Sequence, residues 1–314
     1  MSITANTFQS YQSVGTREDL QNSIYDISPS DVPFMSMIGR SKVKGTFAEW
    51  QTNSLSAAVS TNAQIEGDEY AYTAVTPTVR LGNYTQILRK SVVVSGSQEA
   101  GNHAGRASEM SYAFARMSKE IKRDLETSLT GKKEKTVGSA SAARYLQGVE
   151  SWIVSNKSHG TSGATAAYSA GSAVTDGTQR AFSETLLKAQ IQAAYTAGGD
   201  PDTIMLGPHN KQTFSSFAGR SSARQNIGAE SIQAGASLYA SDFGDFTVKV
   251  NRFMRDRTAL ILDKEYWSVG YFRDFRAEDV AKTGDHVKKI LLCEATLISK
   301  NEAASAKVAD LTTS

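Results

Sequence analysis

The sequence contains few of the features that identify enzymes, membrane proteins or secreted proteins. It has a single cysteine, Cys293, in 314 residues, so it can form no internal disulfide and nothing indicates an oxidising compartment. No apolar run approaches the roughly 18 residues of a membrane span. The first 15 residues lack the basic start and apolar stretch of a signal peptide. We therefore expect no membrane contact and a protein made and used in a reducing cytoplasm, with Cys293 as a small core residue on a strand.

An excess of charge of either sign is also missing. The chain has 34 Lys and Arg residues against 32 Asp and Glu residues, which gives a formal net charge of +2. This balance argues against tight nucleic-acid binding driven by electrostatics alone. Hydrophobic residues make up 40% of the chain and charged residues 21%, and these proportions are typical of a globular protein that buries a core.

Motifs of catalysis and metal binding are absent as well. None of the histidines has another His or a Cys within five positions, so zinc-type spacing is missing. GNHAGRAS (101–108) lacks the Gly-Lys-Ser/Thr ending of a phosphate loop. DFG (242–244) has no accompanying kinase motif, and no G-x-S-x-G elbow occurs. We predict no catalytic residue, no cofactor, no metal site and no enzyme activity; a catalytic site dispersed over distant residues is the alternative.

What is present begins with an adhesive stretch near the N-terminus, TREDLQNSIYDISPSDVPFMSMIGR (16–40). Thr16, followed by two acids, predicts a helix start, and Pro29 predicts that this helix ends near residue 27. FMSMIGR is predicted to form one apolar turn that ends at Gly39. Apolar groups on such an arm gain little in a free monomer, so we expect them to be buried against a neighbouring subunit, and we expect a chain without residues 1–38 to fold.

Two strand-like segments, 45–51 and 79–95, flank a stretch that appears poor in apolar residues. Their separation predicts a long projecting hairpin. The connecting stretch contains three acids, Glu66, Asp68 and Glu69. Their oxygen atoms could bind a divalent cation, but the spacing of a calcium loop is absent, so we interpret the group as a solvated hairpin tip.

The clearest helix is predicted over 107–130. Its apolar stripe has helical spacing and consists of Met110, Phe114, Met117, Ile121 and Leu125. Gly131 is a suitable end for this helix. The other face is expected to carry Lys119, Lys122, Arg123 and Glu126, a pattern typical of a solvated face.

The second half of the chain is predicted to form a small α/β layer followed by strands. The Ser- and Gly-rich residues 154–180 are interpreted as a flexible loop. A helix from Ser183 to Ala197, a short strand and a second helix follow, and strands dominate from residue 236 onward. We expect the alanine-rich segment from Asn301 to be frayed.

The N-terminal stretch and the GTFAEWQ segment that follows it resemble the same region of major capsid proteins of tailed bacteriophages, which share the Hong Kong 97-type fold. The residues that carry the resemblance are Arg17, Glu18, Asp19, Leu20, Ile24, Ile27, Pro29, Pro33, Phe34, Ile38 and Trp50. The motif spans about a tenth of the chain, and the order of predicted elements extends the resemblance over nearly all of it. The fold class that the resemblance implies is α+β.

The resemblance implies a division of the chain into an N-terminal arm, an extended β-hairpin loop, a peripheral domain with a long spine helix, and an axial domain. The corresponding ranges are 1–43 for the arm, 44–95 for the loop, 96–180 and 266–314 for the peripheral domain with its spine helix at 107–130, and 181–265 for the axial domain. Lys90 lies at the base of the loop, so we predict no covalent crosslinking between subunits. We expect scaffolding from a separate protein, unless the sequence is already a processed form.

The function that the resemblance implies is a capsid subunit. It would assemble with itself through hexamers and pentamers into an icosahedral shell around double-stranded DNA. The partners would be a scaffolding protein, a portal and a decoration protein, and the site of assembly would be the cytoplasm of a bacterial host. Candidate contacts between subunits are Ile24, Ile27, Pro29, Pro33, Phe34, Ile38, Glu66, Asp68 and Glu69. Candidate residues of the DNA-facing surface are Lys119, Lys122 and Arg123. An encapsulin-like compartment and a tail or connector protein are the alternatives.

Overall fold

The computed structural model describes residues 31–53, 55–67, 69, 72, 74–101, 105–166, 173–217 and 237–313. In these ranges the helices are α1 (Pro33–Met37), α2 (Gly96–Ala100), α3 (Glu109–Thr130), α4 (Val149–Trp152), α5 (Glu184–Thr196) and α6 (Pro208–Ser215), with 3₁₀ turns η3 (Lys264–Tyr266) and η4 (Glu302–Ala304). The strands are β1 (Gly39–Lys42), β2 (Phe47–Thr52), β3 (Val79–Tyr84), β4 (Gln86–Ser95), β5 (Asn156–Ser158), β6 (Thr203–Leu206), β7 (Leu238–Ser241), β8 (Gly244–Val250), β9 (Ala259–Leu262), β10 (Trp267–Val280), β11 (His286–Ser299) and β12 (Ala306–Val308).

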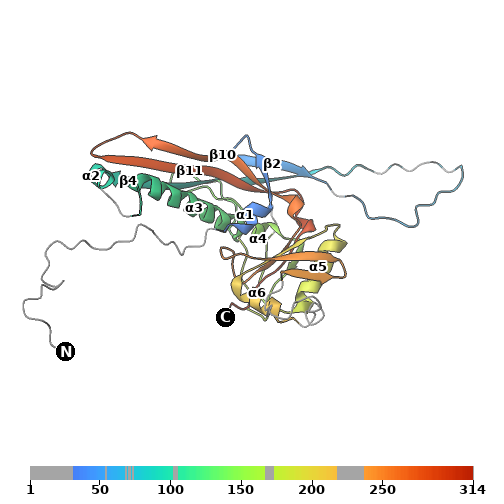
Figure 1. Cartoon of the computed structure of the whole chain (residues 1–314). Coiled ribbons are helices and arrows are strands. Elements are labelled where there is room, and N and C mark those ends of the chain that lie inside the picture. Colours follow the sequence, from blue (N-terminus) through green and yellow to red (C-terminus); the bar gives the residue numbers. More distant parts are fainter. Residues whose placement is uncertain are drawn as a thin grey trace, which may run out of the picture.

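One layer is an elongated sheet with a helix along it. Its strands have the order β1-β10-β11-β4, and α3 runs along the sheet beneath β4 and β11 (Figure 1). The predicted stripe of α3 is confirmed: Met110, Met117, Ile121 and Leu125 are buried, and Phe114 packs against the same core. The helix begins after Ser108, whose hydroxyl accepts a hydrogen bond from the Ser111 N–H, and it ends before Gly131.

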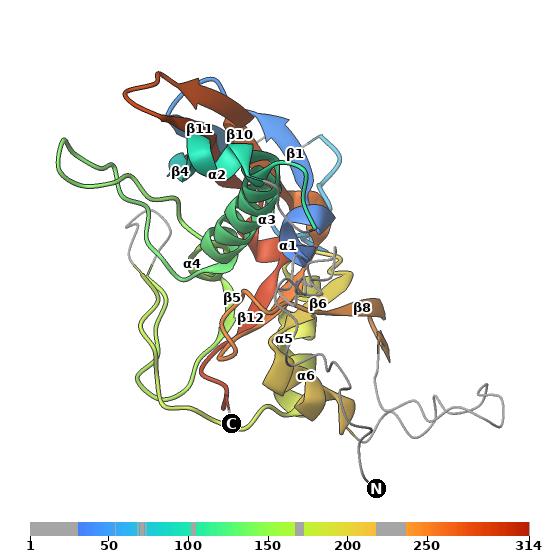
Figure 2. The same ribbon diagram turned by 60° about the vertical axis from the view of Figure 1, so that its left-hand side comes forward.

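The second layer is a sheet with the order β5-β12-β9-β6-β8-β7, which carries α5 and α6 (Figure 2). The predicted helix, strand and helix over 183–215 are confirmed, and Ser183 caps α5 through the Leu186 N–H. This sheet also contains β5 and β12, which come from outside the range 181–265. The proposed axial range therefore shares its sheet with segments on both sides of it in the sequence.

The expectation of a frayed segment after Asn301 is wrong. Strand β12 pairs with β9 on one side and with β5 on the other. Ala306, Val308 and Leu311 are fully buried. The alanine-rich composition reflects tight packing, because small side chains let β12 fit in the interior of the sheet.

The predicted strand over 79–95 is two strands that belong to different sheets. Strand β3 pairs with β2 in the hairpin, whereas β4 pairs with β11 in the elongated sheet. The break is at Thr85, which is fully buried and whose hydroxyl donates to a carboxylate oxygen of Glu294 at 2.6 Å. The hairpin therefore ends at Tyr84, and Lys90 lies opposite α3, where it forms an ion pair with Asp124 at 2.9 Å.

Specific hydrogen bonds hold the described parts of the Ser- and Gly-rich segment, 154–166 and 173–180. These parts therefore do not form the flexible loop that was expected. Ala164 and Thr175 form a reciprocal bridge with N–O distances of 3.0 and 2.8 Å. Arg180 forms a second bridge, to Leu311. Small residues are needed here because the backbones approach closely: a Cβ on Gly160 would lie 2.0 Å from the Thr178 carbonyl oxygen.

Candidate assembly surfaces

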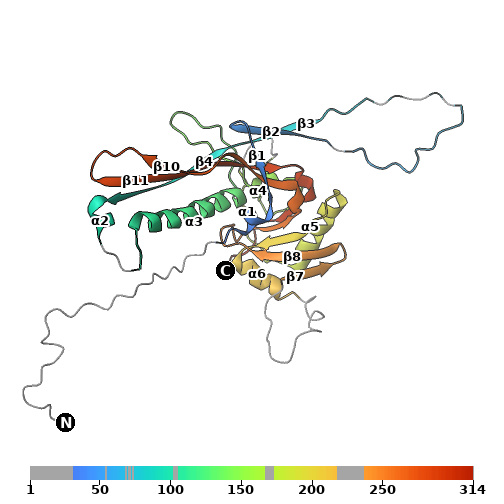
Figure 3. The same cartoon turned by 45° about the horizontal axis from the view of Figure 1, so that its top comes forward.

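The hairpin formed by β2 and β3 projects from one end of the molecule and continues into a long loop (Figure 3). Its base is well anchored. The rings of Phe47 and Tyr84 are 4.4 Å apart, and Trp50 packs on Trp152 at 5.5 Å. Phe47 also covers Gly82, where any Cβ would lie 2.5 Å from the Phe47 ring. A rigid base therefore holds the loop in one direction.

Beyond the base, the loop exposes large apolar side chains. They are Leu55 (96% exposed), Val59 (65%), Ile65 (79%), Tyr72 (96%), Val75 (93%) and Val79 (52%). This apolar content is larger than the sequence pattern indicated, because the residues lie singly among polar ones. Single exposed apolar residues are ordinary, but a series along one projecting loop is typical of surfaces that contact another protein.

The acidic residues predicted for the loop lie on the same projection. Glu66 and Glu69 are exposed, and Asp68 lies outside the described residues. Across the described part of the chain, no group of three or more His, Cys, Asp or Glu residues could hold a metal ion. The loop thus presents apolar groups together with negative charge.

The start of the described chain is fixed to the spine helix through Glu126. The carboxylate of Glu126 is fully buried and accepts hydrogen bonds from the backbone N–H groups of Phe34 (2.7 Å) and Met35 (2.8 Å). It also accepts one from the side-chain amide of Asn251 at 2.7 Å. Burial raises the pKa of Glu126, and the three donors oppose that effect. The expectation that Glu126 lies on the solvated face is wrong, because its carboxylate is the buried acceptor for donors that come from distant parts of the sequence.

This geometry corrects the role expected for Phe34 and Ile38. Their side chains are 0% and 5% exposed and lie in the core of their own subunit with α3. They are therefore not available to a neighbour, and a chain without residues 1–38 would lose part of its core. Pro33 is half-buried at the first position of α1. Ile24, Ile27 and Pro29 lie outside the described residues.

The basic residues predicted on α3 face away from the core to different degrees. Lys119 and Lys122 are exposed, whereas Arg123 is half-buried and its guanidinium lies 5.2 Å from the centre of the Phe253 ring. Two lysines are therefore freely presented, and Arg123 is partly committed to an aromatic contact.

The elongated sheet has a second face, opposite α3. On β4 the residues that alternate with Lys90 point to this face: Ile87 is 49% exposed and Val93 is 59% exposed. On β11, Ile290 and Leu292 pair with Ser91 and Arg89, which lie on this face of β4. Directly paired residues of antiparallel strands share a side, so Ile290 and Leu292 lie on the same face. The face therefore carries an apolar patch.

Basic side chains accompany this patch. Arg89 lies between Ile87 and Val93 on β4. Across the sheet, Arg89 is paired with Leu292 on β11, and Leu292 is paired with Arg276 on β10. Lys288 lies opposite Val93. We call the set Ile87, Arg89, Val93, Arg276, Lys288, Ile290 and Leu292 the outer sheet patch. Glu278 lies opposite Ile290 on the same face and forms an ion pair with Arg276 at 2.7 Å, so the positive charge of the patch that is not paired with Glu278 comes from Arg89 and Lys288.

The thiol of Cys293 is buried and unreactive. Cys293 is fully buried on β11, and burial, followed by the nearby carboxylates of Asp274 and Glu294, raises its pKa to about 12. A thiol with so high a pKa is neither a nucleophile nor a metal ligand at neutral pH. Cys293 is the core residue that the sequence indicated.

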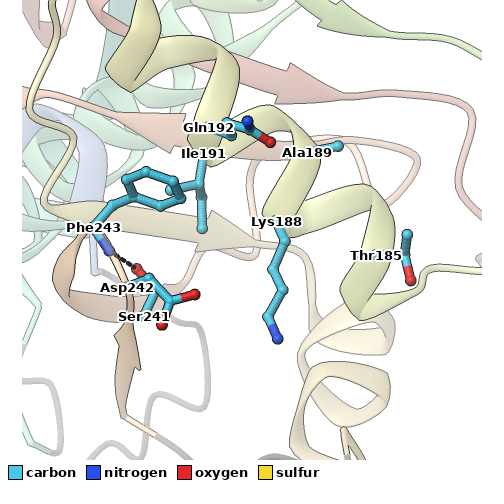
Figure 4. A pocket seen from close by; sticks show the side chains of 8 residues that line it. All are labelled: Thr185, Lys188, Ala189, Ile191, Gln192, Ser241, Asp242 and Phe243. Atoms are coloured by element: carbon cyan, nitrogen blue, oxygen red, sulfur yellow. Dashed lines mark hydrogen bonds between the residues drawn. The ribbon is translucent and has the colours of Figure 1, made fainter.

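A shallow hollow lies between α5 and the β7–β8 turn (Figure 4). Phe243 and Ile191 form its apolar wall, while Lys188 and Asp242 stand at its rim. The DFG tripeptide is the turn at this rim, with Gly244 at a φ of 129°. The hollow contains no nucleophile with an adjacent base, so it has no catalytic constellation.

None of the helices in the described ranges is both long and apolar enough to cross a membrane. Against this background the comparisons with known proteins are decisive. A family model described as SU10 major capsid protein matches residues 3–312. The chain belongs to the SU10 major capsid protein family. The major capsid protein of Escherichia phage Phieco32 is 27% identical over 334 residues, which cover 95% of each chain.

Solved capsid structures share the fold over almost the whole chain. The cyanophage A-1(L) capsid subunit has a TM-score of 0.65 at 12% identity and covers 97% of this chain and 99% of its own. A subunit of the native GTA particle capsid has a TM-score of 0.64 at 11% identity, with coverage of 96% and 98%. A chain from the phage G structure of gp27 major capsid proteins and gp26 decoration proteins has a TM-score of 0.55 at 10% identity, with coverage of 99% and 100%.

These likenesses confirm the Hong Kong 97-type fold that the sequence resemblance implied. The protein is a structural, self-associating subunit of a tailed-phage capsid. The family match favours this reading over an encapsulin-like compartment and over a tail or connector protein.

Proposed function

We propose that the protein assembles through hexamers and pentamers into an icosahedral shell around double-stranded DNA, and that the hairpin loop of each subunit lies on the outer sheet patch of a neighbour. The observation that carries the proposal is the series of exposed apolar side chains from Leu55 to Val79 on one projecting loop. Each gains roughly 25 cal/mol per Å² when a neighbour covers it. Repetition of such contacts under closed symmetry makes a stable shell.

The loop and the outer sheet patch carry side chains of opposite charge. Glu66 and Glu69 are acidic, and Arg89 and Lys288 on the outer sheet patch are basic. Opposite charges fix the register of an apolar contact and suppress wrong pairings. The acceptor of the loop is therefore a second copy of the chain.

Charge reversal tests this pairing. Glu66→Lys with Glu69→Lys is expected to lower the yield of shells at least about tenfold at low salt, because like charges then meet across the contact. Adding Arg89→Glu and Lys288→Glu to the same chain is expected to restore assembly. The readouts are sedimentation and negative-stain microscopy, with the melting temperature of the unassembled chain as a check on folding.

The matched control is Asp200→Lys with Glu265→Lys, which makes the same charge change at exposed sites on the other layer. We expect it to assemble normally. If the four-site variant assembles no better than the two-site variant, the loop does not lie on the outer sheet patch.

The same shell implies further partners. We propose non-specific contact between packaged DNA and Lys119, Lys122 and Arg123, supported by the exposure of the two lysines. Replacement of all three residues by Gln is expected to reduce the length of DNA that is packaged. Normal packaging by this variant would contradict the proposed contact.

The proposal also includes a separate scaffolding protein, a portal and assembly in the host cytoplasm. A decoration protein is included because one structural neighbour carries such proteins. Copurification from infected cells checks these partners.

A further inference from the structure

A continuous chain of hydrogen bonds runs through the interior of the second layer. Asp310 Oδ2 lies 3.3 Å from His159 Nδ1, and His159 Nε2 lies 2.8 Å from Thr165 Oγ1. Thr165 Oγ1 in turn lies 2.6 Å from Lys307 Nζ. Lys307 lies on β12 and Asp310 two residues beyond it, while His159 directly follows β5 and Thr165 lies in the segment after it. All four side chains are at least nine-tenths buried.

The donors and acceptors in this chain can be assigned from chemistry. A carboxylate only accepts, so His159 donates its Nδ1–H to Asp310, and Nε2 of the neutral imidazole is then an acceptor. The Thr165 hydroxyl donates to Nε2 and accepts a hydrogen bond from Lys307 Nζ. The chain is complete only while His159 is neutral.

Hydrogen bonds to Asp310 connect two segments of the chain, one at Gly160 and one at Gly177. Its carboxylate accepts the N–H of Gly160 at 3.0 Å and that of Gly177 at 2.7 Å, and Arg257 donates to it at 3.2 Å. Its backbone has a φ of 60°, a left-handed conformation that is unfavourable for a non-glycine residue. Such a conformation persists where the surroundings over-determine it.

Two cations and one anion act directly on His159: Lys157 on β5, Lys307 on β12, and Asp310. Arg257 and Arg180 act on Asp310, and Asp176 faces Arg257 at 3.8 Å. The acids in the vicinity are Asp310 itself, with Glu150 on α4 and Glu302 on η4 acting on Lys307. An imidazolium at this position would therefore meet more cations than anions.

We propose that Asp310, His159, Thr165 and Lys307 form an acid-sensitive latch, which fastens residues 159–166 and 173–178 to β12 while His159 is neutral and loosens them when His159 takes up a proton. A protonated Nε2 becomes a donor and can no longer accept the Thr165 hydroxyl. The imidazolium also lies next to the Lys307 ammonium. This inference concerns each subunit alone, so it stands or falls independently of the proposed shell contacts.

The direction of the pH dependence follows from the environment. Burial, together with the charge of Lys307, lowers the pKa of His159 from 6.5, against the opposing effect of Asp310. Burial lowers the pKa of Lys307 to about 7. For His159, the unfolded chain therefore takes up the proton first as the pH falls through 6.5, and this contribution to the stability of the latched segment is lost from there downward. The contribution of Lys307 is lost at higher pH, between 10.5 and about 7. Asp310 stays ionised there: although burial opposes it, the N–H groups of Gly177 and Gly160 hold its pKa below the usual range.

The order Asp, His, Thr is also that of a nucleophile with its base and orienting acid. Thr165 is only 5% exposed, however, and its hydroxyl is engaged on both sides by His159 and Lys307. A substrate carbonyl has no approach to it in this arrangement. The cluster is therefore assigned a holding role.

Hydrogen exchange on the full-length chain, followed by mass spectrometry at about pH 8 and about pH 5.5 on either side of the histidine range, tests the latch. After correction for intrinsic exchange, the amides of Gly160, Ala164, Thr175, Gly177 and Thr178 are expected to lose protection about fivefold at the lower pH, the effect of losing one hydrogen bond. Amides of α3 and β6 are expected to keep theirs. Equal protection of the latched amides at the two pH values would overturn the proposal.

Variants separate the latch from general acid destabilisation. His159→Gln removes the titrating imidazole, and Thr165→Val removes the hydroxyl while keeping the shape. In both, protection is expected to be low already at about pH 8 and to fall less than in the wild type at about pH 5.5, with the remaining change due to Lys307, whose pKa is about 7. His286→Gln, on β11 of the other sheet, and Thr165→Ser are expected to keep the wild-type pH response. A wild-type pH response in both His159→Gln and Thr165→Val would contradict the latch.

Discussion

Replacement of Glu126 by alanine is expected to lower the free energy of unfolding by about 3–5 kcal/mol, because three donors would be left in the core without an acceptor. These donors are the backbone N–H groups of Phe34 and Met35 and the amide of Asn251. The loss releases α1 from α3 and exposes Phe34, which is fully buried. Chemical denaturation of the unassembled chain measures the effect.

The matched control is Glu120→Ala on the same helix. Glu120 is half-exposed and forms surface ion pairs with Arg116 and Lys90, so its removal is expected to cost less than about 1 kcal/mol. Glu126→Gln should be milder than Glu126→Ala, since it retains one carbonyl acceptor. Equal stability of Glu126→Ala and Glu120→Ala would contradict the anchoring role.

The pH dependence of this anchor has a defined sign. The folded-state pKa of Glu126 is raised above 4.5 by burial, so the folded chain binds the proton more readily than the unfolded chain. The favourable contribution of the protonated form is present below the unfolded pKa and is lost as the pH rises through the folded value. Glu126→Gln should lack this component when stability is measured across that range.

A chain that stops at Ser305 is expected to lose its cooperative fold. The truncation removes β12 from between β5 and β9 and removes Leu311 from the core. Each buried Leu-sized side chain contributes about 2–5 kcal/mol, and the total stability of a domain is about 5–15 kcal/mol, so the loss of several such residues together with the strand exceeds what the fold can tolerate. Near-UV circular dichroism and limited proteolysis measure the outcome.

The control for the truncation is Thr313→Ala, a half-buried residue beyond the last bridge to Arg180. We expect it to melt cooperatively and close to the wild type. A cooperative melting transition in the truncated chain would show that β12 is an accessory strand, contrary to its place in the sheet.

The elements predicted correctly from sequence are those whose pattern is local. The stripe from Met110 to Leu125 repeats at helical spacing, so α3 could be placed within two residues. Ser183 and the glycines at 198 and 199 mark the ends of α5 in the same way. The order of these elements then extended the family resemblance over nearly the whole chain, and the resemblance supplied the fold, which local patterns alone do not specify.

The incorrect predictions have a common physical cause, which is long-range pairing. Phe34 and Ile38 resemble apolar contact residues of an arm, but their side chains pack against α3, about ninety residues away in the sequence. Residues 306–308 look too small and polar for a core strand until β9 and β5 lie on both sides. The break at Thr85 depends on Glu294, more than two hundred residues further on.

The candidate assembly surfaces were partly visible in the sequence. The loop and its acids Glu66 and Glu69 were predicted, while the outer sheet patch was not, because Arg89, Lys288 and Arg276 come together only through the register of three strands. The latch around Asp310 was likewise hidden, since its histidine and aspartate lie 151 residues apart.

The most direct test of the assembly account is cryo-electron microscopy of particles formed by the full-length chain. The account predicts closed shells built of fivefold and sixfold clusters, with the loop side chains of Leu55, Tyr72 and Val75 in contact with Ile87 and Val93 of an adjacent subunit. Small open oligomers, or shells in which the loop contacts only its own subunit, would contradict it.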